Sequence, residues 1–317
     1  MADKRVSDLG EFGLIARLRE EVATSARTVE GIGDDAAVIE GPEAGRLLLF
    51  ACDTIVEGVH FLPDDSPNKV GHKALACNLS DVAAMGGVPR AATLSLGCAP
   101  ETPVEVIDGL WAGMRALAQE FGVDLVGGDT HRSTCGLVLS VAILGEVERE
   151  LCVYRRGAKP GDFIAVTGML GGSRAGRHLT FTPRVREGRW LAERKLVSAM
   201  IDLSDGLASD LRCVCEASGV GAELQASRIP VSDEAKTAAA VTTARTALEH
   251  ALFDGEDFEL LVTVSPGLLD EAATDFLESF GERLHVLGRI TAEQEIILIH
   301  DDGTAQELSA GGFDHFG

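Results

Sequence analysis

The sequence lacks the segments and residue pairs that mark several common classes of protein. No apolar run approaches the length of a membrane span, and the N-terminus leads into no hydrophobic signal core, so we expect neither membrane insertion nor export. The seven cysteines include no CxxC pair, which argues against a zinc site or a disulfide framework and favours a reducing cytoplasm. No Gly/Ser-rich tract marks a flexible linker.

Basic residues are scarce relative to acidic ones. The 28 Lys and Arg residues stand against 50 Asp and Glu residues, which gives a net charge of −22. Such a surface repels nucleic acid and anionic membranes at long range, so neither is an expected partner. A phosphorylated small molecule would need metal ions or local basic groups to offset the acid, and the candidate groups are Lys73, Arg132, Arg155 and Arg156.

Familiar catalytic motifs are absent as well. The chain contains no GxxxxGK[ST], no HExxH and no GxSxG, which excludes a P-loop enzyme, a zincin and an α/β-hydrolase elbow. Residues 31–36 fit the spacing GxGxxA of dinucleotide-binding turns. However, Asp34 and Asp35 would then face the pyrophosphate, and the residues that follow, 37–39, are typical of a strand rather than a helix.

The length and the periodicity predict two domains of the α+β class. The 317 residues are 45% hydrophobic and 25% charged, the balance of a folded protein. We expect a first domain at 1–148, with an amphipathic helix, a buried strand, a helix, a strand, a helix and a strand at 11–22, 46–56, 67–85, 91–96, 103–121 and 137–145. We expect an α/β domain at 149–317, with a strand, two helices and a strand at 163–168, 184–200, 207–217 and 260–264.

Acidic residues recur beside glycines and next to apolar stretches. Such settings are Asp34/Asp35, Asp53, Asp129, Asp202/Asp205 and Glu256/Asp257, and Asp81 adds a carboxylate to a helix that otherwise reads as buried. Carboxylates beside core strands are unfavourable unless they are paired or bound to metal. Oxygen ligands favour magnesium, calcium or manganese, and magnesium commonly shares its coordination sphere with substrate phosphates. The pattern therefore indicates metal-assisted nucleotide chemistry.

The same residues carry a family resemblance along nearly the whole chain. In order, the motifs are GIGDDAAV (31–38), DTIVEGVHF (53–61), KALACNLSDVAAMGG (73–87), GGDTHR (127–132), RRGAKPGD (155–162), IDLSDGL (201–207), GEDFEL (255–260) and GGFDHF (311–316). Together they resemble the thiamine-monophosphate kinases of the PurM-like ATP-binding superfamily. The resemblance implies a two-domain PurM-like fold whose N-terminal sheets pair in a homodimer.

The resemblance also implies an activity and the residues that perform it. The γ-phosphate of ATP would pass directly to thiamine monophosphate, with several Mg²⁺ ions holding the nucleotide. The implied metal ligands are Asp35, Asp53, Asp81, Asp129, Asp202 and Asp205, of which Asp129 and Asp205 are also the implied catalytic residues. The implied ATP contacts are Gly128, Arg155 and Ser204. The implied contacts to thiamine monophosphate are His60, Glu256 and Phe313, an aromatic ring suited to stacking on a cationic heterocycle.

Alternatives remain open at the level of residues and of function. From the residues alone, His60 could be a structural histidine, Phe313 a core residue and Ser204 a helix N-cap. Ala51 and Cys52 stand where the family usually has hydroxyl residues, so one metal position is lost or completed by water. The stretch 172–183 is shorter than usual. Another ATP-dependent synthetase of the superfamily and a non-catalytic binding homologue are therefore the competing hypotheses.

Overall fold

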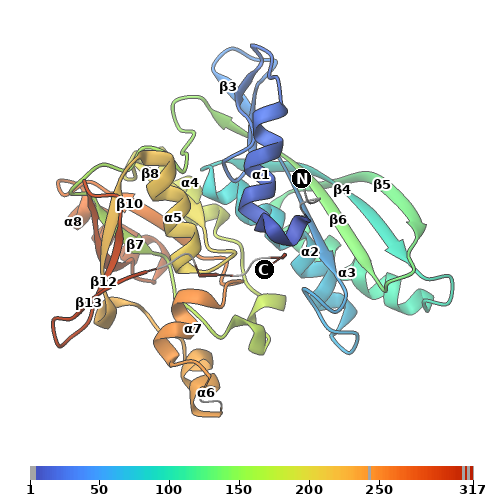
Figure 1. The fold of residues 1–317 in the computed structure, drawn as a ribbon. Helices are drawn as coiled ribbons and strands as arrows, with labels where there is room; N and C mark the ends of the chain where they lie inside the picture. The colour runs from blue at the N-terminus through green and yellow to red at the C-terminus, as the bar shows by residue number, and fades with distance from the viewer. Residues whose placement is uncertain (1–4, 242–243, 309–310, 313–314, 317) are drawn as a thin grey trace.

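Two β-sheets with packed helices divide the chain into two lobes. The computed structural model describes residues 5–241, 244–308, 311–312 and 315–316. The lobes lie side by side, with the second lobe on the left and the first on the right in Figure 1. No helix in these ranges is both long enough and apolar enough to cross a membrane. The predicted α+β fold class is confirmed, with one sheet and its helices in each half of the chain.

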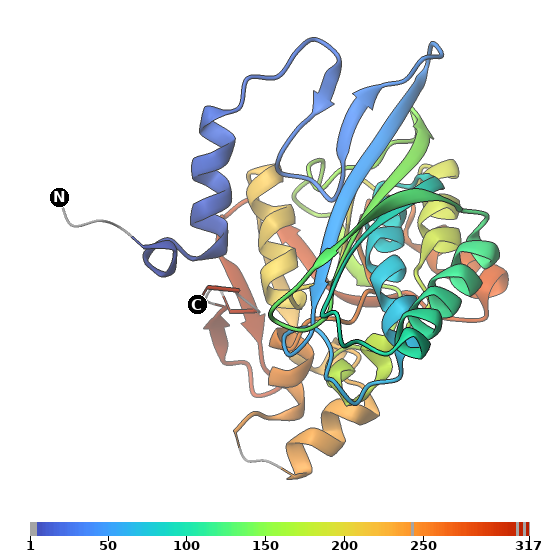
Figure 2. The same cartoon turned by 90° about the vertical axis from the view of Figure 1, so that its right-hand side faces the viewer.

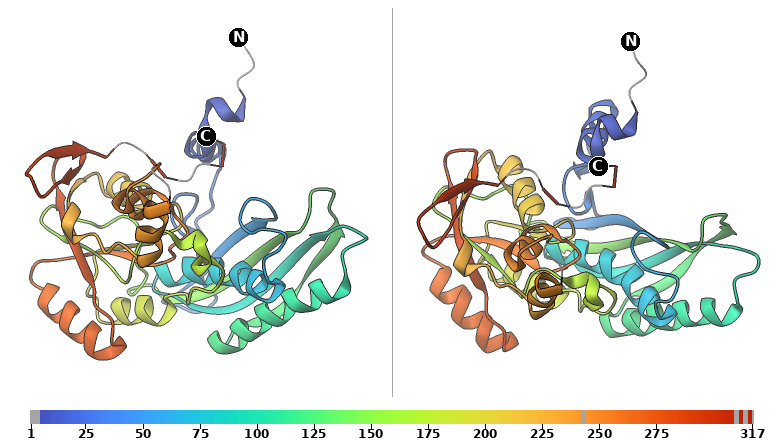
Figure 3. Two further views of the ribbon diagram at one scale, coloured as in Figure 1. Left: turned by 90° about the horizontal axis from the view of Figure 1, so that it is seen from below. Right: turned by 60° about the horizontal axis from the view of Figure 1, so that its bottom comes forward.

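The first sheet has six strands in the order β1-β2-β3-β6-β4-β5. The strands are β1 (Thr28–Glu30), β2 (Ala37–Glu40), β3 (Arg46–Val56), β4 (Val88–Cys98), β5 (Asp124–Arg132) and β6 (Val138–Glu148). Neighbours are antiparallel except β4 and β5, which are parallel. Two helices, α2 (Pro67–Ala84) and α3 (Val104–Phe121), pack together on one face of this sheet (Figure 3). Helix α1 (Gly10–Glu21), after the short turn η1 (Val6–Asp8), stands apart from the sheet in Figure 2 and buries no side chain.

The other face of the first sheet is open. Along β3, Leu47 and Leu49 are buried under the helices, whereas Phe50 is 48% exposed. Its partner on β6, Leu144, is also exposed. The predicted bounds 46–56 are correct, but the prediction of a buried strand is wrong for one of its two faces. A strand that shows one face to helices and one outward alternates between buried and exposed positions.

The second sheet has seven strands in the order β13-β12-β9-β11-β7-β10-β8. The strands are β7 (Phe163–Val166), β8 (Ala199–Asp202), β9 (Gly221–Gln225), β10 (Leu260–Val264), β11 (His285–Thr291), β12 (Ile296–Ile299) and β13 (Ala305–Glu307). The helices and short 3₁₀ turns of this lobe are η2 (Ser173–Ala175), η3 (Arg177–Leu179), α4 (Val185–Glu193), α5 (Leu207–Ser218), η4 (Ala226–Arg228), α6 (Asp233–Val241), α7 (Ala247–Phe253) and α8 (Leu269–Phe280).

The predicted helix over 184–200 is wrong in its second half. Helix α4 ends at Glu193, and Lys195 adopts a left-handed backbone with φ 54°. The chain then enters β8, which pairs with β10 at the edge of the second sheet. Tertiary pairing of the apolar stretch 199–201 therefore overrides its helical propensity, and this matters because β8 ends in Asp202.

Two glycines allow helices α2 and α3 to touch through their backbones. A Cβ on Gly113 would lie 1.8 Å from the carbonyl oxygen of Asn68, and one on Gly71 equally close to that of Leu110. Backbone atoms at a helix crossing have little room to move, so a methyl group at either position would push the helices apart. This close packing fixes α2, which carries several residues of the site described below.

We predict that Gly113→Ala lowers the unfolding free energy by about 2 kcal/mol, because overpacking outweighs the higher helix propensity of alanine. The matched control is Gly13→Ala in α1, where the nearest atom to the added Cβ is 3.4 Å away. That variant should keep or slightly raise the stability. Chemical denaturation followed by circular dichroism measures both. Equal midpoints for the two variants would contradict the close helix contact.

Candidate active site

Three aspartates that are distant in sequence meet between the lobes. Asp35 lies in the turn before β2, Asp81 on α2 and Asp202 at the end of β8, and one carboxylate oxygen from each lies within 4.8 Å of the others. The side chain of Asp35 has no exposed surface, and Asp202 is buried as well. Both lobes therefore contribute to one compact carboxylate cluster.

The electrostatics of this cluster are unfavourable without a cation. Burial, followed by the charges of Asp53 and Asp202, raises the pKa of Asp81 well above its usual value. Burial, and then the charge of Asp35, raises the pKa of Asp202 in the same way and brings the pKa of Asp53 to about 6. Oxygen Oδ2 of Asp35 is buried and has no hydrogen-bond partner among the residues that the structure describes. An orphaned carboxylate oxygen among buried acids fits a hard divalent cation such as Mg²⁺.

Arg155 supplies one positive charge to the cluster. Its Nη2 donates to Oδ1 of Asp35 at 2.6 Å and its Nε to the same atom at 3.2 Å, while its backbone N–H donates to Asp34. Burial opposes the charged guanidinium, but Asp35 stabilises it, so the pKa of Arg155 is raised. Its charge also lowers the pKa of Asp81 and of Asp202, but by less than burial raises it. The predicted ATP contact thus lies directly beside a predicted metal ligand.

The loop after β8 is held by groups that the sequence motifs did not single out. Ser80 on α2 donates to Oδ2 of Asp202 at 2.6 Å. The buried carboxylate of Asp210 accepts hydrogen bonds from the backbone N–H groups of Asp205 and Gly206, at 3.2 and 3.1 Å. Ser204 does not cap α5, whose N-cap position is Gly206. The available sequence signal for Asp210 was its place in the first turn of the helix after the acidic cluster.

A cavity of about 200 Å³ joins the acidic loops to residues predicted to bind substrate. Its lining includes Asp53, Ser204 and Asp205, and also His60 and Glu256. The remaining lining residues are Glu11, Thr54, Ile55, Lys73, Cys77, Arg174, Phe258 and His315. The structure therefore brings one or more predicted metal, nucleotide and substrate residues together around one cavity.

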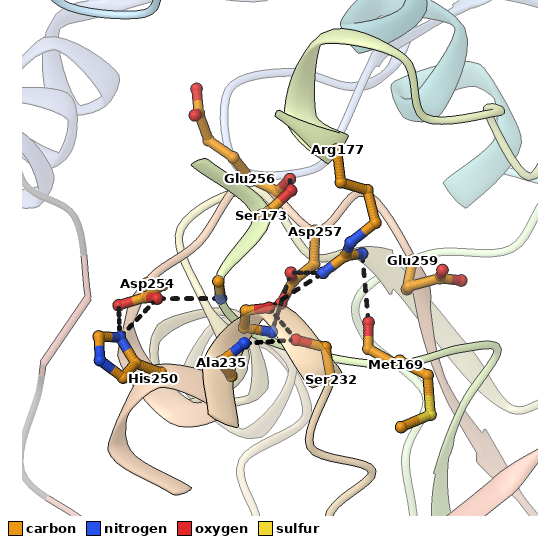
Figure 4. A network of polar contacts seen from close by, with 12 residues as sticks. Met169, Ser173, Arg177, Ser232, Ala235, His250, Asp254, Glu256, Asp257 and Glu259 are labelled. Carbon is orange, nitrogen blue, oxygen red and sulfur yellow. Dashed lines mark hydrogen bonds and ion pairs between the residues drawn. The ribbon is translucent and has the colours of Figure 1, made fainter. Parts of the chain in front are cut away.

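Several hydrogen bonds hold the loop that carries Glu256 against neighbouring segments. Glu256 has a left-handed backbone, φ 56°, and its N–H donates to the carbonyl of Ser204 at 2.7 Å. The hydroxyl of Ser173 donates to the carbonyl of Glu256 at 2.6 Å. On either side, Asp254 and Asp257 accept from the N–H groups of Gly172 and Gly171, and Figure 4 shows these contacts with Arg177 beside Asp257. A non-glycine residue in this conformation persists only when its surroundings hold it there.

His60 is neutral and presents a defined tautomer. Its Nδ1 accepts a hydrogen bond from the N–H of Val56 at 3.0 Å, which leaves the proton on Nε2. Burial, followed by the charge of Lys73, lowers the pKa of His60 to about 4. Lys73 was a candidate phosphate ligand, but its ammonium group is fully buried and lies 2.5 Å from Oε1 of Glu256. Sequence reasoning missed this role because the spacing of 183 residues carries no signal.

Of the predicted site residues that the structure describes, six do not line this cavity: Asp35, Asp81, Asp202 and Arg155, which belong to the carboxylate cluster, and Asp129 and Gly128 on the first sheet. Asp129 lies on the edge strand β5 in a row with Ser95, Ser140 and Thr54, and its side chain is 75% exposed. Strands β4 and β6 separate it from β3, and Gly128 precedes it on the same edge strand. Phe313 lies outside the described residues.

The two residues that replace the usual hydroxyls lie on opposite faces of β3. Ala51 is buried, whereas Cys52 is exposed on the open face, with its sulfur 3.6 Å from the hydroxyl of Ser140. All seven cysteines are free thiols. Asp53 points to the helix-covered side with Ala51, because side chains alternate along a strand. The thiol of Cys52 therefore does not reach the carboxylate cluster from this position.

Comparisons with known proteins agree with this architecture. The family model for AIR synthase related protein, N-terminal domain, matches residues 33–147, and the one for the C-terminal domain matches residues 159–301. The thiamine-monophosphate kinase of Salmonella typhimurium is 39% identical over 97% of this chain and 98% of its own length. The enzyme of the same name from Escherichia coli K12 is 38% identical with the same coverage.

A solved structure extends the likeness to the fold. The structure of AaThiL complexed with AMPPCP and TMP is 31% identical, with a TM-score of 0.86, and covers 99% of this chain and 100% of its own. Both lobes and the site between them fall within these matches. The chain therefore belongs to the thiamine-monophosphate kinase family.

Proposed function

We propose that this protein transfers the γ-phosphate of ATP to thiamine monophosphate, giving ADP and thiamine diphosphate, with Mg²⁺ as the metal. The observation that carries the proposal is the cavity in which Asp53, Ser204 and Asp205 face the same space as His60 and Glu256. The named activity of the relatives supports it, as does the AMPPCP and TMP held by AaThiL.

The acidic residues would hold the metal. Asp35, Asp53, Asp81, Asp202 and Asp205 are the proposed ligands, and the buried Oδ2 of Asp35 is the atom most in need of a cation. Bound Mg²⁺ neutralises and orients the phosphates of the nucleotide. Asp129 and Gly128 belong to the proposal through the family resemblance alone, as does Phe313 as a substrate contact.

The remaining residues bind and orient the two substrates. Ser204 and Arg155 are the proposed ATP contacts, and His60 and Glu256 the proposed contacts to thiamine monophosphate. Neutral His60 donates a hydrogen bond through Nε2, and Glu256 offers an anionic oxygen to the cationic heterocycle. An oxygen of the acceptor phosphate forms the new bond to the γ-phosphorus, the bond to the β–γ bridging oxygen breaks, and ADP leaves. The acceptor phosphate is already ionised near neutral pH, so no general base is required.

We further propose a homodimer, a cytoplasmic location and a domain boundary at residue 148. The open face of the first sheet exposes Phe50 and Leu144, apolar side chains that a second copy of the chain would cover. The seven free cysteines suit a reducing compartment. The first sheet ends at Glu148 and the second begins at Phe163, which supports domains at 1–148 and 149–317.

We predict that the purified protein, given ATP, Mg²⁺ and thiamine monophosphate, forms ADP and thiamine diphosphate in equal amounts. Chromatography of both products measures this directly. ADP without thiamine diphosphate would favour another ATP-dependent synthetase of the superfamily. Binding of both substrates without any product would favour a non-catalytic homologue.

We predict that Asp202→Asn lowers kcat by about a hundredfold or more, because the variant loses a charge that holds the metal at the reacting phosphates. The fold should persist, since asparagine can still accept the hydrogen bond from Ser80. Asp108→Asn, at an exposed position on α3, is the matched control and should retain full activity. A steady-state assay at saturating Mg²⁺ compares them, and similar rates would refute the metal assignment.

We predict that burial of Asp53 makes the magnesium-free protein less stable as the pH rises. Its pKa is about 6 when folded against 3.8 in the reference state, so its contribution is fully favourable below pH 3.8 and is lost as the pH passes 6. Relative to Asp53→Asn, the wild type should lose about 3 kcal/mol between these limits. Denaturation in EDTA at pH 4 to 7 measures the difference, and saturating Mg²⁺ should remove it. If the unfolding free energies of wild type and Asp53→Asn in EDTA change equally with pH, the raised pKa of Asp53 is contradicted.

A further inference from the structure

Lys73 is fully buried, and each of its three ammonium hydrogens has an acceptor. Its side chain projects from α2, and Nζ lies 2.7 Å from the carbonyl oxygen of His60, 2.9 Å from Nδ1 of His178 and 2.5 Å from Oε1 of Glu256. A lysine ammonium has three donors and no acceptor capacity, so this set satisfies it completely. A buried lysine with such a complete set of partners is held in one geometry.

The three acceptors come from both lobes. His60 follows β3 in the first lobe, whereas His178 belongs to η3 and Glu256 to the loop after α7 in the second. His60 and Glu256 line the cavity of about 200 Å³, as does Lys73 itself. His178 lines an adjoining cavity of about 270 Å³ that shares His60 and Arg174 with the first. Each contact of the ammonium group thus ends on a residue of a cavity wall.

The contact between Lys73 and Glu256 determines which carboxylate oxygen of Glu256 is left for a ligand. Oε1 is taken by Lys73, while Oε2 makes no hydrogen bond and lies 3.3 Å from both Nε of Arg174 and Nδ1 of His178. The loop backbone is fixed by Ser204 and Ser173, so the hydrogen bond from Lys73, at 2.5 Å, is the shortest contact that orients the carboxylate itself. Its hydrogen bond to the carbonyl of His60 similarly fixes the segment that presents the imidazole.

We propose that Lys73 is a positioning residue for the phosphate acceptor: it sets Glu256 and His60 in the geometry that binds a cationic phosphate ester such as thiamine monophosphate. This inference rests on the proposed function, because it concerns the acceptor side of the same cavity. It predicts that Lys73 affects acceptor affinity and leaves nucleotide affinity unchanged. A lysine that served only to stabilise the lobe interface would affect neither affinity in the folded protein.

Isothermal titration calorimetry on the full chain tests the proposal with thiamine monophosphate and, separately, with ATP and Mg²⁺. Lys73→Met should weaken acceptor binding about thirtyfold or more, because Glu256 loses the partner that orients it. The dissociation constant for ATP should stay within about twofold. Lys69→Met is the matched control, since Lys69 lies one turn earlier on α2 and is exposed, and it should change neither constant.

Two further variants separate positioning from stability. Lys73→Arg keeps the buried charge paired, so it should fold even if Lys73→Met does not, and it should still weaken acceptor binding at least about threefold by displacing Glu256. In the double variant Lys73→Met/Glu256→Gln, the loss should be smaller than the product of the two single losses, because Lys73 acts partly through Glu256.

An unchanged acceptor affinity in folded Lys73→Arg would overturn the inference and leave the proposed function intact. Single losses that multiply fully in the double variant would also overturn the role assigned to Glu256. Wild-type protein that neither binds nor turns over thiamine monophosphate would instead overturn the proposed function, and the acceptor site with it.

Discussion

The mutual repulsion of buried carboxylates is the constraint on which this structure depends. Asp35, Asp81 and Asp202 are brought within a few ångströms of one another in a region from which water is largely excluded. In such surroundings ionised carboxyl groups are strongly unfavourable unless a cation compensates them. Arg155 pairs with Asp35, and its charge lowers the pKa of Asp81 and Asp202 by less than burial raises it. The folded protein therefore contains unfavourable carboxylate repulsion that a bound metal ion and its nucleotide would relieve. Binding of these ligands would then raise the stability of the folded state.

Helix α2 makes this arrangement possible. It lies against the first sheet on one side and against α4 and β8 of the second lobe on the other. One stretch of this helix provides Lys73 toward the acceptor end of the cavity and Ser80 and Asp81 toward the carboxylate cluster. Because Lys73 and Asp81 lie on the same helix, the distance between them is set by helix geometry rather than by flexible loops. Its close backbone contact with α3 keeps the helix in place.

Local patterns predicted much of the fold and the acidic half of the site. The long stretch rich in Ala and Leu at 67–85 predicted a helix and the apolar run at 46–56 predicted a strand, and acids next to glycines mark loops that meet between the lobes. What the sequence could not supply depends on contacts between distant segments. Residues 199–202 form a strand that pairs with β10. Lys73 in the first lobe pairs with Glu256 in the second. Asp129 shows the converse: a motif that looks like the others is placed on an exposed edge strand.

The charge of Glu256 and the orientation of its carboxylate would contribute differently to ligand binding. Lys73 pairs with one of its oxygens and Arg174 lies at ion-pair distance from the other, so its negative charge is largely compensated before any ligand arrives. A carboxylate whose charge is largely compensated attracts a distant cation weakly, in contrast to the buried carboxylates of Asp81 and Asp202. Its contribution to binding must then arise at short range, from an oxygen held at a fixed place without a hydrogen bond. Under the proposed function, selectivity for the acceptor would depend on the geometry of Glu256, whereas attraction of a metal would depend on the net charge of the carboxylate cluster.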